Sequence, residues 1–184
     1  MKKILFIIDK IELKYFEFNN LVTNFWMIKE FLERGNQVFI TTISNLSLKQ
    51  DVAYTKCFET FTDKNNIFYK DIKIEKEIND FDLVMFRPDP PVDIDYINAT
   101  YIFDFVTKPR VINSPQAIRD FNEKLHSVYF KELMTDNIVT ASLEEIEAFL
   151  AKYKQIVLKP LNRCFGSGVM YLYEGDPNTR TIIN

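Results

Sequence analysis

The chain has few of the residues that build metal sites and disulfide frameworks. Its 184 residues include two cysteines, one histidine and four glycines. Cys57 and Cys164 lie far apart and form no CxxC pair, and His126 is the only histidine, so the sequence predicts no zinc site. We expect both thiols to be reduced, as in a cytoplasmic protein.

Long apolar runs and an excess of positive charge are also missing. No stretch reaches the roughly 18 apolar residues that span a bilayer. The first apolar run, Ile4 to Ile8, is too short for a signal peptide, and Asp9 interrupts it. The net charge of −3 offers no basic field for a nucleic-acid backbone. These features predict a cytoplasmic protein with neither a membrane nor a nucleic-acid partner.

The residues that are present indicate a folded α/β protein. Hydrophobic residues make up 47% of the chain and aromatic residues 15%, which permits a sizeable core. Ile4 to Ile8 is typical of a strand covered on both faces. Leu21, Phe25, Ile28 and Leu32 follow at helical spacing, Gly35 suits a C-terminal cap, and Val38 to Ile40 is a second strand. This order predicts a parallel sheet with a right-handed crossover.

The middle of the chain is predicted to add a hairpin insertion, two further strands and a helix. Tyr54 to Phe61 and Ile67 to Ile74 are predicted as a hairpin around the polar turn Thr62 to Asn66. Leu83 to Phe86 and Val111 to Ile112 are predicted strands. Between them, Asp93 or Asp95 begins a helix, for which we predict an inner face of Ile94, Ile97, Tyr101 and Phe105. Residues 1–120 are therefore predicted to form a three-layer α/β domain with a mainly parallel sheet.

From about residue 120 the pattern changes to a smaller α+β piece, residues 121–184. Ser142 to Glu145 is a capping box, and the helix that follows has an apolar stripe of Ile146, Phe149, Leu150 and Tyr153. Ile156 to Leu158 and Val169 to Tyr173 are predicted strands.

A glycine loop, Gly166-Ser167-Gly168, joins these last two strands. Its position between strands argues against a dinucleotide fingerprint or a Walker loop, because both need a helix after the glycines. Two interpretations stay open, a loop that offers backbone N–H groups to a triphosphate and an ordinary hairpin. Two interpretations also stay open for Lys159 and Lys124. Each either offers a point charge to a phosphate or is a solvated surface lysine.

Arg87-Pro88-Asp89-Pro90-Pro91 follows the Leu83 to Phe86 strand, at the sheet edge where ligands bind in open α/β folds. The planar fork of Arg87 suits a carboxylate. The alternative is a rigid turn in which Arg87 pairs with Asp89. Asp9 is either a pocket residue or a turn former, and His126 is interpreted as structural or surface.

Taken in order, these motifs closely resemble prokaryotic glutathione synthetase over essentially the whole chain. The segments that carry the resemblance are Met85 to Pro91, Ala99 to Ile102, Ile112 to Gln116, Arg119-Asp120, Asn122 to Leu125, Ile156 to Leu161 and Glu174 to Asn178. The resemblance implies an N-terminal substrate domain of the pre-ATP-grasp type over 1–120 and part of an ATP-grasp nucleotide-binding domain over 121–184. It also implies a carbon–nitrogen ligase that joins γ-glutamylcysteine to glycine through an acyl phosphate, using ATP and Mg²⁺.

By motif match, the resemblance assigns nucleotide phosphates to Lys124 and Lys159. It assigns a lid to Asn162 through Gly168, including Gly166, Ser167 and Gly168, and the substrate cleft to Arg87 and Asp89. It assigns no catalytic or metal-binding residue within the chain. The family lid reads Asp-Gly, any residue, Gly-Gly, whereas this chain has Arg163 and Phe165 at two glycine positions, which predicts a stiffer lid.

The resemblance stops before the family's magnesium ligands and substrate-carboxylate arginines. We therefore expect the isolated chain to be inactive, and to need either a C-terminal partner chain or self-association to cover the inner face of the last two strands. A non-catalytic remnant or assembly module is the alternative function. A freestanding flavodoxin-like binding domain is a further alternative.

Overall fold

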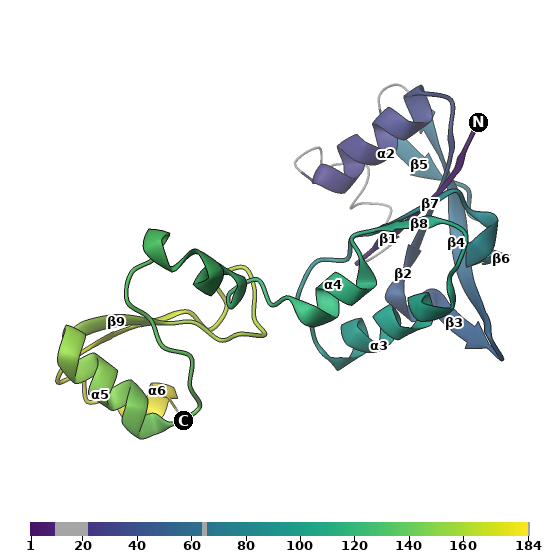
Figure 1. Cartoon of the computed structure of the whole chain (residues 1–184). Coiled ribbons are helices and arrows are strands. Elements are labelled where there is room, and N and C mark those ends of the chain that lie inside the picture. The colour runs from purple at the N-terminus through teal and green to yellow at the C-terminus, as the bar shows by residue number, and fades with distance from the viewer. Residues whose placement is uncertain (10–21, 64–65, 184) are drawn as a thin grey trace. The chain divides into compact units, whose positions relative to one another are not determined.

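The computed structural model describes residues 1–9, 22–63 and 66–183, in two compact units, Met1–Asp120 and Phe121–Asn184 (Figure 1). Leu21 of the predicted helix face and Lys64 and Asn65 of the predicted turn lie outside the described residues.

The first unit is built on a mixed sheet with the strand order β3-β4-β2-β1-β7-β8. Four of these strands run parallel, namely β2 (Gln37–Thr42), β1 (Lys3–Ile8), β7 (Leu83–Phe86) and β8 (Arg110–Ile112). The predicted β–α–β start and the buried strand over Ile4 to Ile8 are confirmed. Because parallel strands end at one edge, the residues after Ile8, Phe86 and Ile112 gather there.

The other part of the sheet is antiparallel and is organised by the long strand β4 (Val52–Asp63). This strand pairs with β2, β3 (Leu46–Lys49), β5 (Asn66–Tyr69) and β6 (Ile74–Glu77). The predicted hairpin is confirmed in β4 and β5. However, its second strand is not continuous to Ile74, because the polar segment Lys70 to Lys73 separates β5 from β6, and β3 was not predicted.

Helices cover both faces of the sheet, which confirms the three-layer α/β prediction. Figure 1 shows α2 (Thr23–Glu33) on one side and α3 (Ile94–Ile102) with α4 (Pro115–Asp120) on the other. The side chains of β1 alternate between two buried clusters. Leu5 and Ile7 belong to the cluster that includes Ala99 of α3, and Phe6 belongs to the cluster that includes Ile28 of α2. Short 3-10 turns complete the unit at η1 (Ile43–Asn45), η2 (Ile78–Asp80) and η3 (Phe103–Phe105).

The predicted inner face of α3 is wrong. Ile94 is 69% exposed and Tyr101 51%, whereas Tyr96 and Ala99 are buried. The helix is turned because the ring of Tyr96 contacts that of Phe86, with 5.5 Å between the ring centroids. Its start was predicted correctly, since the Asp93 side chain accepts a hydrogen bond from the Tyr96 N–H at 3.0 Å.

The second unit consists of η4 (His126–Leu133), α5 (Leu143–Tyr153), an antiparallel pair of strands, β9 (Gln155–Leu158) and β10 (Met170–Tyr173), and α6 (Thr179–Ile183). The predicted cap is confirmed, because the Ser142 hydroxyl accepts a hydrogen bond from the Glu145 N–H at 3.3 Å. Ile146 and Leu150 of α5 and Leu172 of β10 are buried. The pair Val157 and Tyr171 points to the opposite face and is 53% and 57% exposed.

Candidate functional sites

The first candidate site lies at the carboxyl edge of the parallel strands. The Arg87 N–H donates to the Ile7 carbonyl at 2.9 Å, which continues the pairing of β7 with β1 by one residue. Asp9 follows β1 directly, and its carboxylate accepts a hydrogen bond from the Asp89 N–H at 2.5 Å. The structure therefore brings together Asp9, Arg87 and Asp89.

Arg87 is held by a residue that the sequence analysis missed. Its Nε donates to Oδ1 of Asn24 at 2.8 Å, and the Asn24 amide donates back to the Arg87 carbonyl at 3.4 Å. Asn24 is polar but only 5% exposed, because it lies on the buried face of α2. The sequence signal for it was a polar residue beside Phe25 in an apolar helix face. No ion pair joins Arg87 to Asp89 within the described part of the chain, so the Arg87–Asp89 pairing in the turn alternative is wrong.

Two carboxylates and a neutral, buried phenol lie at this edge. Burial raises the pKa of Asp9 above the ordinary 3.8, and the negative charge of Asp89 raises it further, while the Asp89 N–H lowers it. The Tyr96 hydroxyl donates to the Pro88 carbonyl at 3.2 Å. Burial and the charges of Asp9 and Asp89 raise the pKa of Tyr96 to about 12, so the phenol is protonated at neutral pH.

Asn113 closes the edge from β8. Its backbone N–H and its side-chain amide both donate to the Phe86 carbonyl, at 3.4 and 3.3 Å. Arg87 directly follows Phe86 in the chain. Its terminal guanidinium nitrogens have no partner among the described residues. A guanidinium fork beside two carboxylates is suited to a ligand that carries both a carboxylate and an ammonium group.

The second candidate site lies on the loop between β9 and β10. The Lys124 ammonium donates to the Arg163 carbonyl at 2.6 Å and to Glu123 at 2.7 Å. The Asn122 side chain donates to the Leu161 carbonyl at 3.0 Å. Residues 122–124 are thus bound to the start of the loop, so Lys124 is not an ordinary solvated lysine. Lys159 is exposed and has no hydrogen bond or ion pair among the described residues.

Two consecutive tight turns shape the loop itself. The Ser167 N–H donates to the Cys164 carbonyl at 2.9 Å, and the Val169 N–H donates to that of Gly166 at 3.1 Å. The N–H groups of Gly166 and Gly168 have no acceptor within the described ranges, so they are available to an anion. Gly168 has a φ of +72°, and an added Cβ would lie 2.9 Å from Pro160 Cγ. Both constraints require glycine at this position.

Phe165 has an unusual backbone conformation for a residue with a side chain. Its φ is +53°, a conformation that favours glycine, and its side chain is 83% exposed. The backbone at this position therefore adopts a glycine-like conformation without a glycine.

His126 has a structural environment. Its ring lies edge-to-face against Phe121, with 4.2 Å between the centroids, and 5.4 Å from the ring of Tyr129. This arrangement agrees with the interpretation of His126 as structural or surface.

A magnesium ion does not fit the residues that are described. Residues 1–9, 22–63 and 66–183 contain no group of three or more histidine, cysteine, aspartate or glutamate side chains that could hold a metal. No chemical step is therefore assigned to a metal held by this chain. A surface depression of about 290 Å³ between α5 and α6 is lined by none of the predicted phosphate-binding residues. None of the helices described is long and apolar enough to cross a membrane.

The structure is an α/β protein in two units, with one candidate site at the carboxyl edge of the parallel strands and another on the loop between β9 and β10. The fold resembles that of D-alanyl-alanine synthetase A from Vibrio cholerae, with a TM-score of 0.55 and 12% sequence identity. The similarity covers 98% of this chain and 56% of that protein.

Sequence comparison identifies the family. Residues 2–119 match the N-terminal domain of prokaryotic glutathione synthetase, and residues 123–184 match the ATP-grasp domain of the same family. The chain belongs to the prokaryotic glutathione synthetase family.

Curated relatives carry the name glutathione synthetase. The protein from Vibrio parahaemolyticus is 36% identical over 167 residues, which are 88% of this chain and 52% of the relative. The protein from Neisseria meningitidis is 35% identical over 170 residues, covering 88% and 53%. That from Buchnera aphidicola is 32% identical over 165 residues, covering 88% and 52%. The chain therefore spans about half the length of the curated relatives it matches.

Proposed function

We propose that the chain supplies the dipeptide-binding domain and part of the nucleotide-binding domain of a glutathione synthase. The reaction is the ATP-dependent ligation of γ-glutamylcysteine to glycine. The observation that carries the proposal is that both domains of the family match in order along one chain, at residues 2–119 and 123–184. ATP and Mg²⁺ are proposed as the nucleotide and the cofactor on the same basis, and the cytoplasm as the location.

In the first unit, the proposal assigns γ-glutamylcysteine to the carboxyl edge of the sheet. The terminal nitrogens of Arg87 would bind a carboxylate of the dipeptide, because Nε is already engaged by Asn24. Asp9 and Asp89 carry the negative charge that the ammonium of the γ-glutamyl group would neutralise. Together these groups would orient the dipeptide by both of its charges.

In the second unit, the proposal assigns the phosphates of ATP to Lys159 and to the N–H groups of Gly166 and Gly168, with Ser167 between them. Lys124 would contribute after exchanging the Arg163 carbonyl for a phosphate oxygen. The γ-phosphoryl group passes from ATP to a carboxylate oxygen of the dipeptide, which gives an acyl phosphate and ADP. The glycine amine then attacks the acyl carbon, phosphate leaves, and the amine loses a proton.

The isolated chain is proposed to bind ATP weakly and not to turn over. Lys159 and the loop residues Gly166 to Gly168 are exposed, whereas ligand sites usually bury most of the ligand. A non-catalytic assembly module is the second candidate function. The open face of the β9–β10 pair favours it, because Val157 and Tyr171 are 53% and 57% exposed there.

Calorimetry and a phosphate-release assay test these proposals. We expect ATP to bind the isolated chain with a Kd of about 1 mM or weaker, and Lys159→Ala to weaken binding further. Lys131→Ala is the matched control, since Lys131 is another exposed lysine of the second unit. Micromolar binding by the isolated chain, lost in Lys159→Ala, would contradict the proposal of weak binding.

The turnover assay uses ATP, Mg²⁺, γ-glutamylcysteine and glycine, with and without the C-terminal half of the Vibrio parahaemolyticus relative as a second chain. The ligase proposal predicts glycine-dependent phosphate release only in the mixture. Release by the isolated chain would refute the proposed inactivity. No release from a mixture in which the two chains associate would favour the assembly module.

A further inference from the structure

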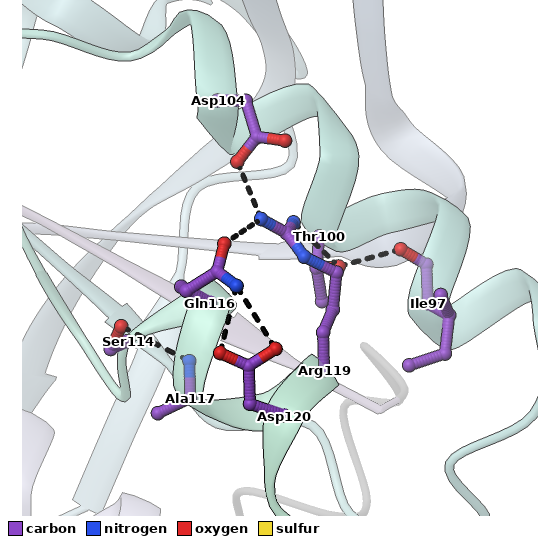
Figure 2. Close-up of polar contacts among 8 residues, drawn as sticks. All are labelled: Ile97, Thr100, Asp104, Ser114, Gln116, Ala117, Arg119 and Asp120. Carbon is purple, nitrogen blue, oxygen red and sulfur yellow. Dashed lines mark hydrogen bonds and ion pairs between the residues drawn. The ribbon is translucent and has the colours of Figure 1, made fainter.

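The helix α4 (Pro115–Asp120) is anchored by the partly buried side chain of its own Arg119. The helix has six residues, none of them buried, and a helix this short is not stable alone. Ile118 is partly buried against the core cluster that contains Ala99. The Arg119 side chain is 12% exposed, and its guanidinium lies between α4 and α3 (Figure 2).

Arg119 makes hydrogen bonds to three elements. The guanidinium donates to Asp104 of η3 at 2.7 Å, to Thr100 of α3 at 3.2 Å and to Gln116 of its own helix at 2.8 Å (Figure 2). Its central carbon also lies 4.9 Å from the ring centroid of Tyr101. A planar fork with several fixed donors is specific to arginine, and lysine cannot reproduce it.

The other members of this cluster fix the geometry of Arg119 in turn. The Gln116 amide donates to both carboxylate oxygens of Asp120, at 2.9 and 2.8 Å, which leaves its carbonyl oxygen to accept from Arg119. The Thr100 hydroxyl donates to the Ile97 carbonyl at 2.6 Å. Its lone pair is thereby directed towards the guanidinium. The contact is therefore a connected network and not a single surface ion pair.

The network is linked to the proposed dipeptide site through the two residues that precede α4, Asn113 and Ser114. The Ser114 hydroxyl accepts from the Ala117 N–H at 3.3 Å, and its carbonyl accepts from the Ile118 N–H at 3.0 Å. Asn113 comes directly before and makes two long hydrogen bonds to the Phe86 carbonyl, one residue from Arg87. These two bonds are longer than most N–H···O hydrogen bonds and therefore weak, so they do not fix the position of Asn113 by themselves.

We propose that Arg119 is a positioning residue for γ-glutamylcysteine. By fixing α4 on α3, it holds Asn113 against the end of β7 and so keeps Arg87 aligned for the carboxylate of the dipeptide. This inference rests on the proposed function of the carboxyl edge. Arg119 itself does not contact the ligand, because its guanidinium is engaged by Asp104, Thr100 and Gln116.

The test compares Arg119→Lys with Arg110→Lys in the whole chain. Arg110 is an exposed arginine of β8 in the same unit. Titration calorimetry measures the Kd for γ-glutamylcysteine, NMR follows the amide signals of Asn113 and Arg87, and urea unfolding reports global stability. We expect Arg119→Lys to weaken dipeptide binding about ten-fold and to shift both amide signals, as loss of a supporting contact does to a site. Arg110→Lys should change none of these.

A second variant guards against misfolding of the first. Asp104→Asn keeps an acceptor for Arg119 and removes only the charge, so its effect on dipeptide binding should have the same sign and be smaller. If the wild type binds the dipeptide and Arg119→Lys binds it equally well, the positioning role is refuted while the proposed function of the edge stands. A wild-type chain that does not bind γ-glutamylcysteine would refute the proposed function of the edge, and the positioning role with it.

Discussion

The small core of the second unit makes Leu172→Ala a decisive substitution. Leu172 is fully buried, and the other buried hydrophobic residues of this unit are Ile146 and Leu150, at 8% and 5% exposure, within the described chain. Replacing a buried leucine with alanine costs about 2–5 kcal/mol, because both transfer energy and packing are lost. A unit of about 60 residues has a stability of roughly 3–9 kcal/mol in total. The substitution should therefore remove a large share of the stability of the second unit and raise its unfolded fraction by about 30-fold or more.

Hydrogen exchange measured by mass spectrometry resolves this effect along the chain. In Leu172→Ala we expect peptides from α5, β9 and β10 to lose protection, while peptides from β1, β2 and β7 keep theirs. The reason is that the two core clusters that surround β1 lie within the first unit.

Val157→Ala is the control for Leu172→Ala. Val157 lies on the opposite face of the same pair of strands and is 53% exposed, so this change should cost less than about 1 kcal/mol. Equal loss of protection in both variants would refute the assignment of Leu172 to a one-sided core. Loss of protection in the sheet of the first unit would refute the independence of the two cores.

Three further outcomes follow from individual side chains. Gly168→Ala should destabilise the β9–β10 hairpin more than Gly166→Ala, by about 1 kcal/mol or more. Both glycines have positive φ, but only Gly168 has a neighbour 2.9 Å from the added Cβ. Equal hydrogen-exchange rates in the two variants would contradict this. The pKa of Asp9 is raised on folding, so this group costs stability as the pH rises above 3.8, and Asp9→Asn should flatten that part of the curve of unfolding free energy against pH; an unchanged curve would refute the assignment. Burial raises the pKa of the Cys57 thiol to about 11, so mass spectrometry should find iodoacetamide on Cys164 well before Cys57 in the native chain at pH 8; the opposite order would contradict the burial of Cys57.

Much of the first unit could be predicted because its strands are continuous apolar runs. The segment Ile4 to Ile8 alternates between two buried clusters, so no polar face obscures the pattern. The face of α3 could not be predicted from spacing. Ile94 and Tyr101 are as apolar as Ala99, and the contact between Tyr96 and Phe86 decides which side turns inwards.

The candidate site was predictable in position and not in its contacts. The end of a buried parallel strand placed Arg87 and Asp89 at the ligand edge on topology alone. The partner of Arg87 is Asn24, which lies 63 residues away on another element, and no local pattern encodes that contact. A short spacing in the sequence suggested Asp89 instead, yet the Asp89 N–H is directed to Asp9.

The loop between β9 and β10 shows how far a backbone path depends on its surroundings. Phe165 occupies a position to which the resemblance assigns glycine, and it still has a φ of +53°, which costs a residue with a side chain about 1–2 kcal/mol. The path is imposed from outside this residue, by Lys124 on the Arg163 carbonyl and by the close approach of Gly168 to Pro160. The substitution therefore adds strain to the loop while the turn geometry remains. Strain of this kind lowers the cost of any rearrangement that lets residue 165 leave the left-handed region.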